Sequence, residues 1–248
     1  MKAVILAAGV ASRLRPWTNR TPKCLLPIGD GTLLDRTLEA VEAAGLRDIV
    51  LVTGYLEEQI RARVRERYAR LNVEFVRNAV YDSTNNIYSL WLARDRVLGE
   101  GLLLLDSDIL FDPAILDDLR SAGRPDVLAV KTGTVLGEEE IKVEVDAERR
   151  IRAIGKQIPP ERAFGESIGI EIFSPAALTG LYRSLENKVV REGAVGVFYE
   201  AAFQDWIDGG GILTAVDIGA RPATEIDTID DFRAAEKDVL PLLPKLRS

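Results

Sequence analysis

The first thirty residues carry side chains of the types that bind phosphate groups. An apolar run ends in Leu6-Ala7-Ala8-Gly9, and small residues after a strand let a ligand approach the backbone. Arg13 and Arg15 follow, and their guanidinium groups match phosphate oxygens in geometry as well as in charge. Lys23 lies in the same stretch. Free backbone N–H groups beside these cations would cradle a phosphate chain.

The charge distribution agrees with a local anion site. Residues 1–29 hold five positive charges and no Asp or Glu, whereas the rest of the chain carries a net charge of −12. An acidic protein with one basic segment is a poor non-specific nucleic-acid binder, and a pocket for a small polyanion is the better interpretation. Chance clustering is the alternative. The G-x-G-x-x-G and P-loop motifs are absent, which argues against dinucleotide binding and excludes a P-loop.

Two acidic groups, far apart in the sequence, offer the ligand type that Mg²⁺ prefers. Asp106 and Asp108 come at the end of an apolar run, on one side of the strand if it stays extended. Asp227 lies in the second group, Glu225-Ile226-Asp227. Because Mg²⁺ takes hard oxygen ligands, Asp108 and Asp227 would form a metal site if the fold brings them together. A turn role for Asp108 and a helix-start role for Asp227 are the alternatives.

Amide and hydroxyl side chains gather near the predicted start of a helix at about residue 86. Such groups read the edge of a nucleotide base or cap the helix, and the sequence leaves both roles open. The members that we expect to contact a nucleotide are Asn78, Thr84, Asn85, Asn86 and Ser89.

Strand-like runs alternate with amphipathic helical stretches, which indicates an α/β fold. In such folds the carboxyl ends of the strands border the ligand crevice. We therefore expect the basic segment, the acidic groups and the amide and hydroxyl side chains to lie together there. Residues 127–173 give successive strand signals without a convincing helix, which predicts a small antiparallel excursion from a mostly parallel sheet. We expect a single domain over residues 1–240 and a loose tail over residues 241–248. The predicted strands are 3–8, 48–53, 73–77, 101–106, 127–131, 142–145, 150–155, 167–173 and 212–216.

The composition excludes several kinds of chemistry. The 248 residues contain no histidine, which rules out an imidazole base, a Ser-His or Cys-His nucleophile and a His-ligated metal. A single cysteine excludes a disulfide framework within the chain and suits a reducing compartment. No apolar run approaches the roughly 20 residues that span a bilayer, and nothing looks like a signal peptide. We expect a cytoplasmic protein without membrane insertion.

The N-terminal segment resembles the signature of nucleotidyltransferases that activate sugar phosphates and related phosphomonoesters. The matching pattern is Leu6-Ala7-Ala8-Gly9-x-x-Ser12-Arg13-Leu14-Arg15-Pro16, continued by Pro22-Lys23-x-Leu25-Leu26-Pro27. In that family the loop backbone, the Arg and the Lys hold the triphosphate of the incoming nucleotide. The resemblance extends over about residues 1–240. It implies a Rossmann-like three-layer α/β/α fold with a mixed, mostly parallel sheet, a nucleotide loop at Leu6, Ala7, Ala8 and Gly9, and catalytic Arg13 and Lys23.

The same resemblance bears on the acidic groups. Related enzymes carry a metal-binding Asp after the corresponding strand and another near the C-terminal end, which implies Mg²⁺ at Asp108 and Asp227. The form Asp106-x-Asp108 and the run from Asn85 to Leu90 are similar to the bacterial choline-phosphate cytidylyltransferases. The resemblance therefore implies that Asp106 lies at the nucleotide.

The acceptor side is defined less sharply. Lys156 and Glu166 match acceptor-side positions of the family, with a solvated strand-end lysine as the alternative for Lys156. Tyr199 and Glu200 belong to a group of aromatic and acidic residues that could hold a quaternary ammonium by cation–π contact and charge. The helical spacing of Phe198 and its neighbours is also typical of a core face.

The residues and the resemblance together predict a Mg²⁺-dependent cytidylyltransferase that transfers CMP from CTP to a small phosphomonoester and releases pyrophosphate. Phosphocholine is the leading acceptor, and a sugar 1-phosphate, an inositol phosphate or aminoethylphosphonate are alternatives. A nucleotide-binding regulatory subunit is the non-enzymatic alternative. We expect no nucleic-acid partner and leave a homo-oligomer open. A phosphate with a second pKa of about 6 is largely deprotonated at neutral pH, so this reaction needs no imidazole base.

Overall fold

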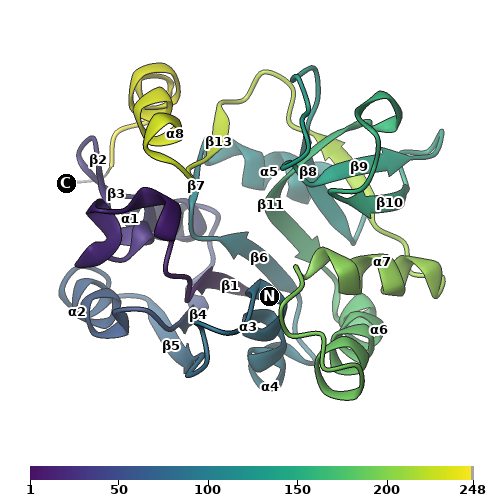
Figure 1. Cartoon of the computed structure of the whole chain (residues 1–248), viewed down its shortest axis with the longest axis horizontal. Coiled ribbons are helices and arrows are strands. Elements are labelled where there is room, and N and C mark those ends of the chain that lie inside the picture. The colour runs from purple at the N-terminus through teal and green to yellow at the C-terminus, as the bar shows by residue number, and fades with distance from the viewer. Residues whose placement is uncertain (247–248) are drawn as a thin grey trace.

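A computed structural model describes residues 1–246, which fold around one mixed β-sheet (Figure 1). The order across the sheet is β10-β9-β11-β6-β1-β4-β5, and β8 pairs with β11 and with β12. The bounds of these strands are β1 Lys2–Ala7, β4 Asp48–Thr53, β5 Asn72–Arg77, β6 Leu102–Asp106, β8 Val127–Lys131, β9 Lys142–Val145, β10 Ile151–Gly155, β11 Gly165–Phe173 and β12 Thr214–Asp217.

The central strands are parallel and nearly continuous in apolar residues, because both of their faces are covered. In the register of β1 with its neighbours, Val4 lies opposite Val50 and Leu104. Ile5 packs into one core and Val4 into another, as the alternation of side chains along a strand requires. The antiparallel partner β11 makes the sheet mixed.

Helices cover both faces of the sheet and give three layers. One core joins the sheet to α1, α2 and α5, and the other joins it to α3, α6 and α7. The expected three-layer α/β/α fold is therefore confirmed. The bounds of the helices are α1 Leu33–Ala43, α2 Glu57–Arg67, α3 Asn86–Leu92, α4 Arg94–Val97, α5 Ala114–Ser121, α6 Pro175–Glu186, α7 Glu200–Asp208 and α8 Ile229–Ala234.

The antiparallel excursion between residues 127 and 173 is also confirmed, and it is built into the main sheet. β8, β9 and β10 follow one another, and β11 then returns antiparallel to β6, β8 and β9. The strand predicted at 212–216 is β12, which runs parallel to β8.

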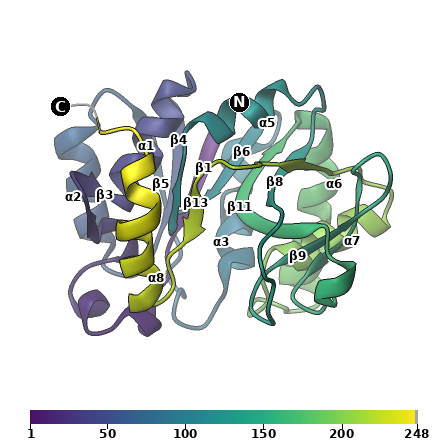
Figure 2. The ribbon, with the colours of Figure 1, turned by 90° about the horizontal axis from the view of Figure 1, so that it is seen from above.

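Two small sheets, which the sequence did not predict, lie beside the main sheet. β7 (Ile109–Phe111) pairs antiparallel with β13 (Ala223–Glu225), and β2 (Pro27–Ile28) pairs with β3 (Gly31–Thr32). The C-terminal helix α8 lies beside α1 and β3, as both views show (Figures 1 and 2). A third core cluster lies at this contact, and it contains Phe232 of α8 together with Leu14 and Ile28.

The tail that we expected to be loose is in contact with the N-terminal part as far as it is described. The backbone N–H of Leu246 donates to Asp30 at 3.0 Å, and Arg36 donates to the carbonyl of Pro244 at 3.2 Å. Residues 247 and 248 lie outside the described residues. Among the helices that the structure describes, none has the length and apolar character needed to cross a bilayer.

Candidate active site

A cavity of about 650 Å³ lies at the carboxyl ends of β1 and β6 and gathers the residues predicted from the sequence. It receives side chains from both ends of the chain and from the antiparallel excursion. Every predicted site residue except Tyr199 lines it, namely Leu6, Ala7, Ala8, Gly9, Arg13, Lys23, Asn78, Thr84, Asn85, Asn86, Ser89, Asp106, Asp108, Lys156, Glu166, Glu200 and Asp227.

The loop after β1 is held by backbone contacts with the loop after β4. The N–H of Tyr55 donates to the carbonyl of Ala8 at 3.0 Å. A Cβ atom on Gly54 would lie 2.8 Å from that carbonyl, so the close approach requires glycine. A Cβ atom on Gly9 would meet nothing within 4 Å, and the space in front of this part of the loop is therefore open.

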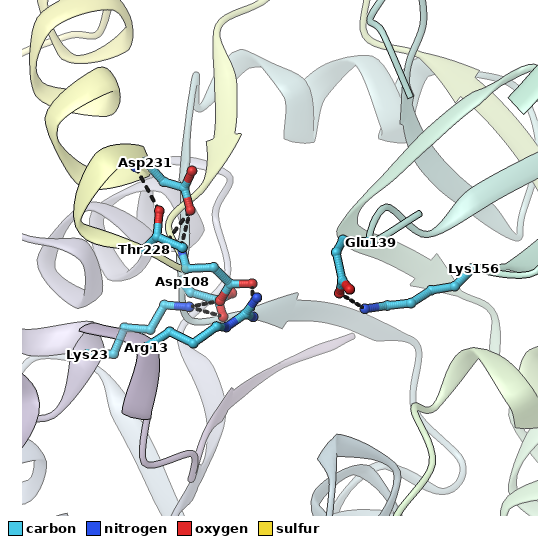
Figure 3. A network of polar contacts seen from close by, with 8 residues as sticks. Arg13, Lys23, Asp108, Glu139, Lys156, Thr228 and Asp231 are labelled. Atoms are coloured by element: carbon cyan, nitrogen blue, oxygen red, sulfur yellow. Dashed lines mark hydrogen bonds and ion pairs between the residues drawn. The ribbon is translucent and has the colours of Figure 1, made fainter. Parts of the chain in front are cut away.

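Lys23 is the centre of a charged network (Figure 3). Its Nζ lies 2.8 Å from Asp108 Oδ2 and 2.6 Å from Asp227 Oδ1, and Arg13 forms an ion pair with Asp227. Burial lowers the pKa of the Lys23 ammonium, but the two carboxylates outweigh burial and hold this pKa above its usual value. Burial raises the pKa of Asp227, but Lys23 and Arg13 hold it below its usual range. Lys23 and Asp227 are therefore both charged at neutral pH.

The small β7–β13 sheet explains how acids far apart in the sequence meet. Ile109 lies opposite Glu225, and the N–H of Ile226 donates to the carbonyl of Asp108 at 3.0 Å. Ile226 is fully buried in the third core cluster. Because side chains alternate along an extended segment, Glu225 and Asp227 both point away from that core and toward the cavity.

These acids form a donor set that fits a divalent cation. Asp108, Glu225 and Asp227 each offer one carboxylate oxygen within 4.8 Å of the others. Asp108 Oδ1 is buried without a hydrogen-bond partner. Hard carboxylate oxygens with one oxygen unpartnered fit Mg²⁺, and Glu225 is a candidate ligand that we did not predict.

The start of α8 positions Asp227 without using its carboxylate. Thr228 is the N-cap residue and forms a capping box with Asp231. Asp231 Oδ2 accepts from the N–H groups of Thr228, at 2.7 Å, and Asp227, at 3.1 Å. The helix-start alternative therefore applies to Thr228 and Asp231, and the carboxylate of Asp227 is left for Lys23 and Arg13.

Asn78 is almost fully buried and organises the wall of the cavity. Its Nδ2 donates to Thr84 Oγ1 at 3.0 Å and to Ser89 Oγ at 3.1 Å, and its Oδ1 accepts from the N–H of Val80. Asn78 therefore holds the other two polar side chains in place, in addition to lining the cavity itself.

Asn85 and Asn86 have observed structural roles at the start of α3. Asn85 is the N-cap residue, and its Oδ1 accepts from the N–H of Asn86 at 2.8 Å. Asn86 Oδ1 accepts from the N–H of Tyr199 at 3.0 Å and so ties α3 to α7. The capping alternative thus applies to Asn85, and nucleotide contact by either residue stays a prediction.

The acceptor side of the cavity holds a second, separate polar group. Lys156 Nζ lies 2.8 Å from Glu139 Oε2 and 4.9 Å from the centre of the Phe198 ring. Figure 3 shows this pair facing the network of Lys23 across the site. Glu166 is half-buried, and burial and the charge of Glu140 raise its pKa.

Tyr199 does not lie where we expected it. Its side chain is fully buried, it does not line the cavity, and its hydroxyl donates to Asp106 Oδ2 at 2.8 Å. The ring packs against Phe203, with 4.9 Å between ring centres, because residues of α7 at helical spacing face the core. Tyr199 therefore reaches the site only through Asp106.

Tyr81, Glu139 and Glu225 are among the residues of the cavity wall that sequence reasoning missed. Glu225 lies two residues from Asp227, on the same side of an extended segment, and that spacing was a usable signal. Tyr81 lies between Asn78 and Thr84, within the polar stretch we had assigned to the nucleotide. Glu139 is one of three consecutive glutamates in a loop, a pattern typical of a solvated surface, and it gave no signal.

The family is established by comparison with known proteins. Residues 3–153 match the family described as the MobA-like NTP transferase domain, and the chain belongs to this family of nucleotidyltransferases. CMP-5'-(3-aminopropyl)phosphonate synthase of Streptomyces rubellomurinus is 29% identical over 95% of this chain and 38% of that protein. Choline-phosphate cytidylyltransferase of Streptococcus pneumoniae is 37% identical over 48% of this chain and 50% of that protein. The predicted resemblance to cytidylyltransferases is confirmed.

The matches to curated relatives are partial in length, whereas the matches to solved structures extend over nearly the whole chain. The chain spans about half the length, or less, of the curated relatives it matches. The inositol-1-phosphate CTP transferase from T. maritima matches 97% of this chain and 94% of its own, with a TM-score of 0.80 at 24% identity. The CTP:phosphocholine cytidylyltransferase from Streptococcus pneumoniae gives a TM-score of 0.75 at 22% identity, over 95% and 97% of the two chains. These structures establish the fold.

Proposed function

We propose that the protein transfers CMP from CTP to a small phosphate- or phosphonate-bearing acceptor, releases pyrophosphate and requires Mg²⁺. The observation that carries this proposal is the convergence of Lys23 and Arg13 with Asp108 and Asp227 at the open loop Ala7-Ala8-Gly9. Cations, carboxylates and free backbone N–H groups in one cavity are what a nucleoside triphosphate and its metal require.

In the proposed reaction, an acceptor oxygen attacks the α-phosphorus of CTP in line. A new acceptor-oxygen-to-α-phosphorus bond forms, and the bond from the α-phosphorus to the bridging oxygen of pyrophosphate breaks. Lys23 and Arg13 offset the negative charge of the triphosphate and of the leaving pyrophosphate. The acceptor oxygen is already deprotonated at neutral pH, so no residue needs to take a proton from it.

The carboxylates of Asp108 and Asp227, with Glu225 beside them, would hold the Mg²⁺ ion. When bound, Mg²⁺ would supply positive charge that offsets the charge of the reacting phosphates. Since Lys23 contacts both aspartates, it aligns the two carboxylates and keeps them within reach of one cation.

The choice of CTP is supported by the relatives, several of which are named for cytidylyl transfer. Their names describe different acceptors, among them choline phosphate, phosphoglutamine and 2-aminoethylphosphonate. Phosphocholine is the acceptor that the sequence favours, and the relative aligned over 95% of this chain supports an aminoalkylphosphonate.

The test is an assay of pyrophosphate release with the four nucleoside triphosphates and a panel of acceptors, in Mg²⁺ and in EDTA. We expect turnover with CTP, only in the presence of Mg²⁺, and with one or more small phosphate or phosphonate acceptors. Turnover confined to dTTP or UTP with glucose 1-phosphate would contradict the proposal.

A variant ties the activity to the site. Asp108→Asn should lower kcat/KM by about 100-fold or more, because it removes a carboxylate that would hold Mg²⁺ at the reacting phosphates. Asp112→Asn is a matched control, since Asp112 starts α5 outside the cavity. Full activity of Asp108→Asn would remove Asp108 from the proposed metal site.

A further inference from the structure

Glu200 is a buried carboxylate that lines the cavity, and one of its two oxygens lacks a hydrogen-bond partner. It is the first residue of α7 and is only 6% exposed. Its Oε2 atom is buried and accepts no hydrogen bond. A buried carboxylate oxygen without a donor is unfavourable, and a donor on a ligand would remove that cost.

Two further acids lie behind Glu200 and make this end of the cavity strongly acidic. Asp106 lines the cavity, and its Oδ2 accepts from Tyr199. Glu171 of β11 is fully buried, and both of its carboxylate oxygens lack a partner. Burial, then the neighbouring charges, raises the pKa of Glu171, and burial raises the pKa of Glu200 to about 7. Carboxyl groups gathered in a buried region, with oxygens that accept no hydrogen bond, favour a hydrogen-bond-donating cation beside them.

The protein already places one primary ammonium at this end. Lys156 Nζ contacts Glu139 at 2.8 Å and lies over the Phe198 ring. Phe198 and Glu200 both line the cavity at the start of α7. The space therefore accommodates an ammonium group that donates to a carboxylate.

A quaternary ammonium would find no aromatic cage here. In the part of the chain that the structure describes, Tyr81 and Phe198 are the aromatic residues that line the cavity. Lys156 already lies over the Phe198 ring, and Tyr81 packs beside the nucleotide loop, next to Gly54. Tyr199, which we had expected to contribute, packs into the core against Phe203, and Trp206 packs against Phe173.

From this geometry we infer that the acceptor carries an ammonium group with at least one N–H, which donates a hydrogen bond to Glu200, at the opposite end from its phosphate or phosphonate. This inference rests on the proposed function and names its substrate class. A trimethylammonium group has no N–H and would leave the Glu200 oxygen unpartnered.

The experiment is a methylation series of one acceptor, assayed with CTP and Mg²⁺. The series is phosphoethanolamine, its N-methyl and N,N-dimethyl forms, and phosphocholine, with 2-hydroxyethyl phosphate as the uncharged analogue. The first three keep an N–H, so we expect the largest fall in kcat/KM at the last methylation. That fall should be roughly 10- to 100-fold, as for a lost hydrogen bond to a charged group. The uncharged analogue should be as poor as phosphocholine or poorer.

A variant and a control locate the effect. Glu200→Gln should bring phosphoethanolamine and phosphocholine to within about threefold of each other, with the KM for CTP unchanged, because the charged partner is gone. Asp205→Asn lies on the same helix, where Asp205 pairs with Lys188 at 3.0 Å outside the cavity, and should keep the wild-type preference.

The outcomes separate this inference from the proposed function. Turnover of CTP with phosphocholine or an inositol phosphate, at a rate equal to or above that with phosphoethanolamine, overturns the inference and leaves the proposed function standing. No turnover of CTP with any acceptor overturns both. The wild-type series decides the matter even if Glu200→Gln does not fold.

Discussion

Lys23 contributes to stability as well as to the proposed chemistry, because it is a buried cation between two carboxylates. Lys23→Met leaves Asp108 and Asp227 facing each other with Arg13 as the remaining cation. We expect this change to lower the free energy of unfolding by about 3–5 kcal/mol in EDTA, the usual cost of breaking a buried ion pair. Mg²⁺ should recover part of the loss, since a divalent cation binds the folded carboxylates.

Thermal unfolding with and without Mg²⁺ measures this effect. Lys188→Met is the control, because Lys188 pairs with Glu192 and Asp205 away from the cavity. Its melting temperature should change little, since surface pairs contribute roughly 0–1 kcal/mol. An equal loss of stability for Lys23→Met in Mg²⁺ and in EDTA would contradict the role assigned to the carboxylates.

Glu171 predicts a dependence of stability on pH. Burial, followed by the charges of Asp106 and Glu200, raises the pKa of Glu171 in the folded protein. At a pH above the ordinary pKa of glutamate, the unfolded state has therefore released the Glu171 proton, whereas the folded state still binds it. Stability from this group is complete below the unfolded pKa and is lost as the pH rises toward the folded pKa, by about 1.4 kcal/mol per pH unit.

Glu171→Gln removes this proton while keeping the size of the side chain. The fall in unfolding free energy between pH 5 and 8, measured by urea denaturation, should be smaller in the variant than in the wild type. Glu161→Gln, at an exposed position in a turn, should leave the wild-type slope unchanged. Parallel pH profiles for the wild type and Glu171→Gln would show that this carboxyl is ionised in the folded protein.

At the scale of single residues, the sequence indicated which side chains take part in the site better than it indicated which side chains touch one another. Arg13, Lys23, Asp108 and Asp227 were predicted from their type and from the signature around them. Glu171 was not, because it lies in a strand-like run and nothing local reveals that its carboxylate meets two others. Tyr199 was misplaced for a related reason: an aromatic residue beside a carboxylate fits a site and a core equally well in sequence.

At the scale of elements, the capping box of α8 positions one of the proposed metal ligands. Asp231 accepts from the N–H groups of both Thr228 and Asp227. Thr228→Val should cost about 1 kcal/mol of stability, as the loss of an N-cap does, and should shift Asp227. We expect the Mg²⁺ concentration for half-maximal activity to rise by roughly tenfold, as when a metal ligand loses its support.

The chain offers a matched control for this prediction. Thr32 and Asp35 form the same capping box at the start of α1, away from the cavity. Thr32→Val should have a similar cost in stability and no effect on the Mg²⁺ requirement. If both variants change the Mg²⁺ requirement equally, the change is caused by general destabilisation and not by a shift of Asp227.

The regular elements of the fold were predicted well, and the short ones were not. Strands such as β1, β4 and β6 have long apolar runs, which identify them without knowledge of their partners. β7 and β13 have three residues each, too few for any periodicity, and they exist because they pair. The meeting of Asp108 with Glu225 and Asp227 depends on that pairing, so the complete metal site could not be derived from local pattern.

At the scale of the whole molecule, α8 covers the basic N-terminal segment. Phe232 is buried and packs edge-on against Trp17, with 5.2 Å between ring centres. Phe232→Ala should destabilise the protein by about 3–5 kcal/mol. Hydrogen exchange should rise more in residues 12–28 than in β4 and β5, because these strands belong to other cores. A uniform rise across the chain would contradict this local coupling.

The contact between the two ends of the chain also has a consequence for synthesis. Lys23 and Asp227 are 204 positions apart. At roughly 5–20 residues per second, a ribosome adds Asp227 about ten to forty seconds after Lys23. Throughout that interval the nascent chain carries its basic loop without the late carboxylates and the helix that covers it. Under the proposed function, a polypeptide released before residue 227 would keep the basic loop but lack Asp227, one of the carboxylates proposed to hold Mg²⁺.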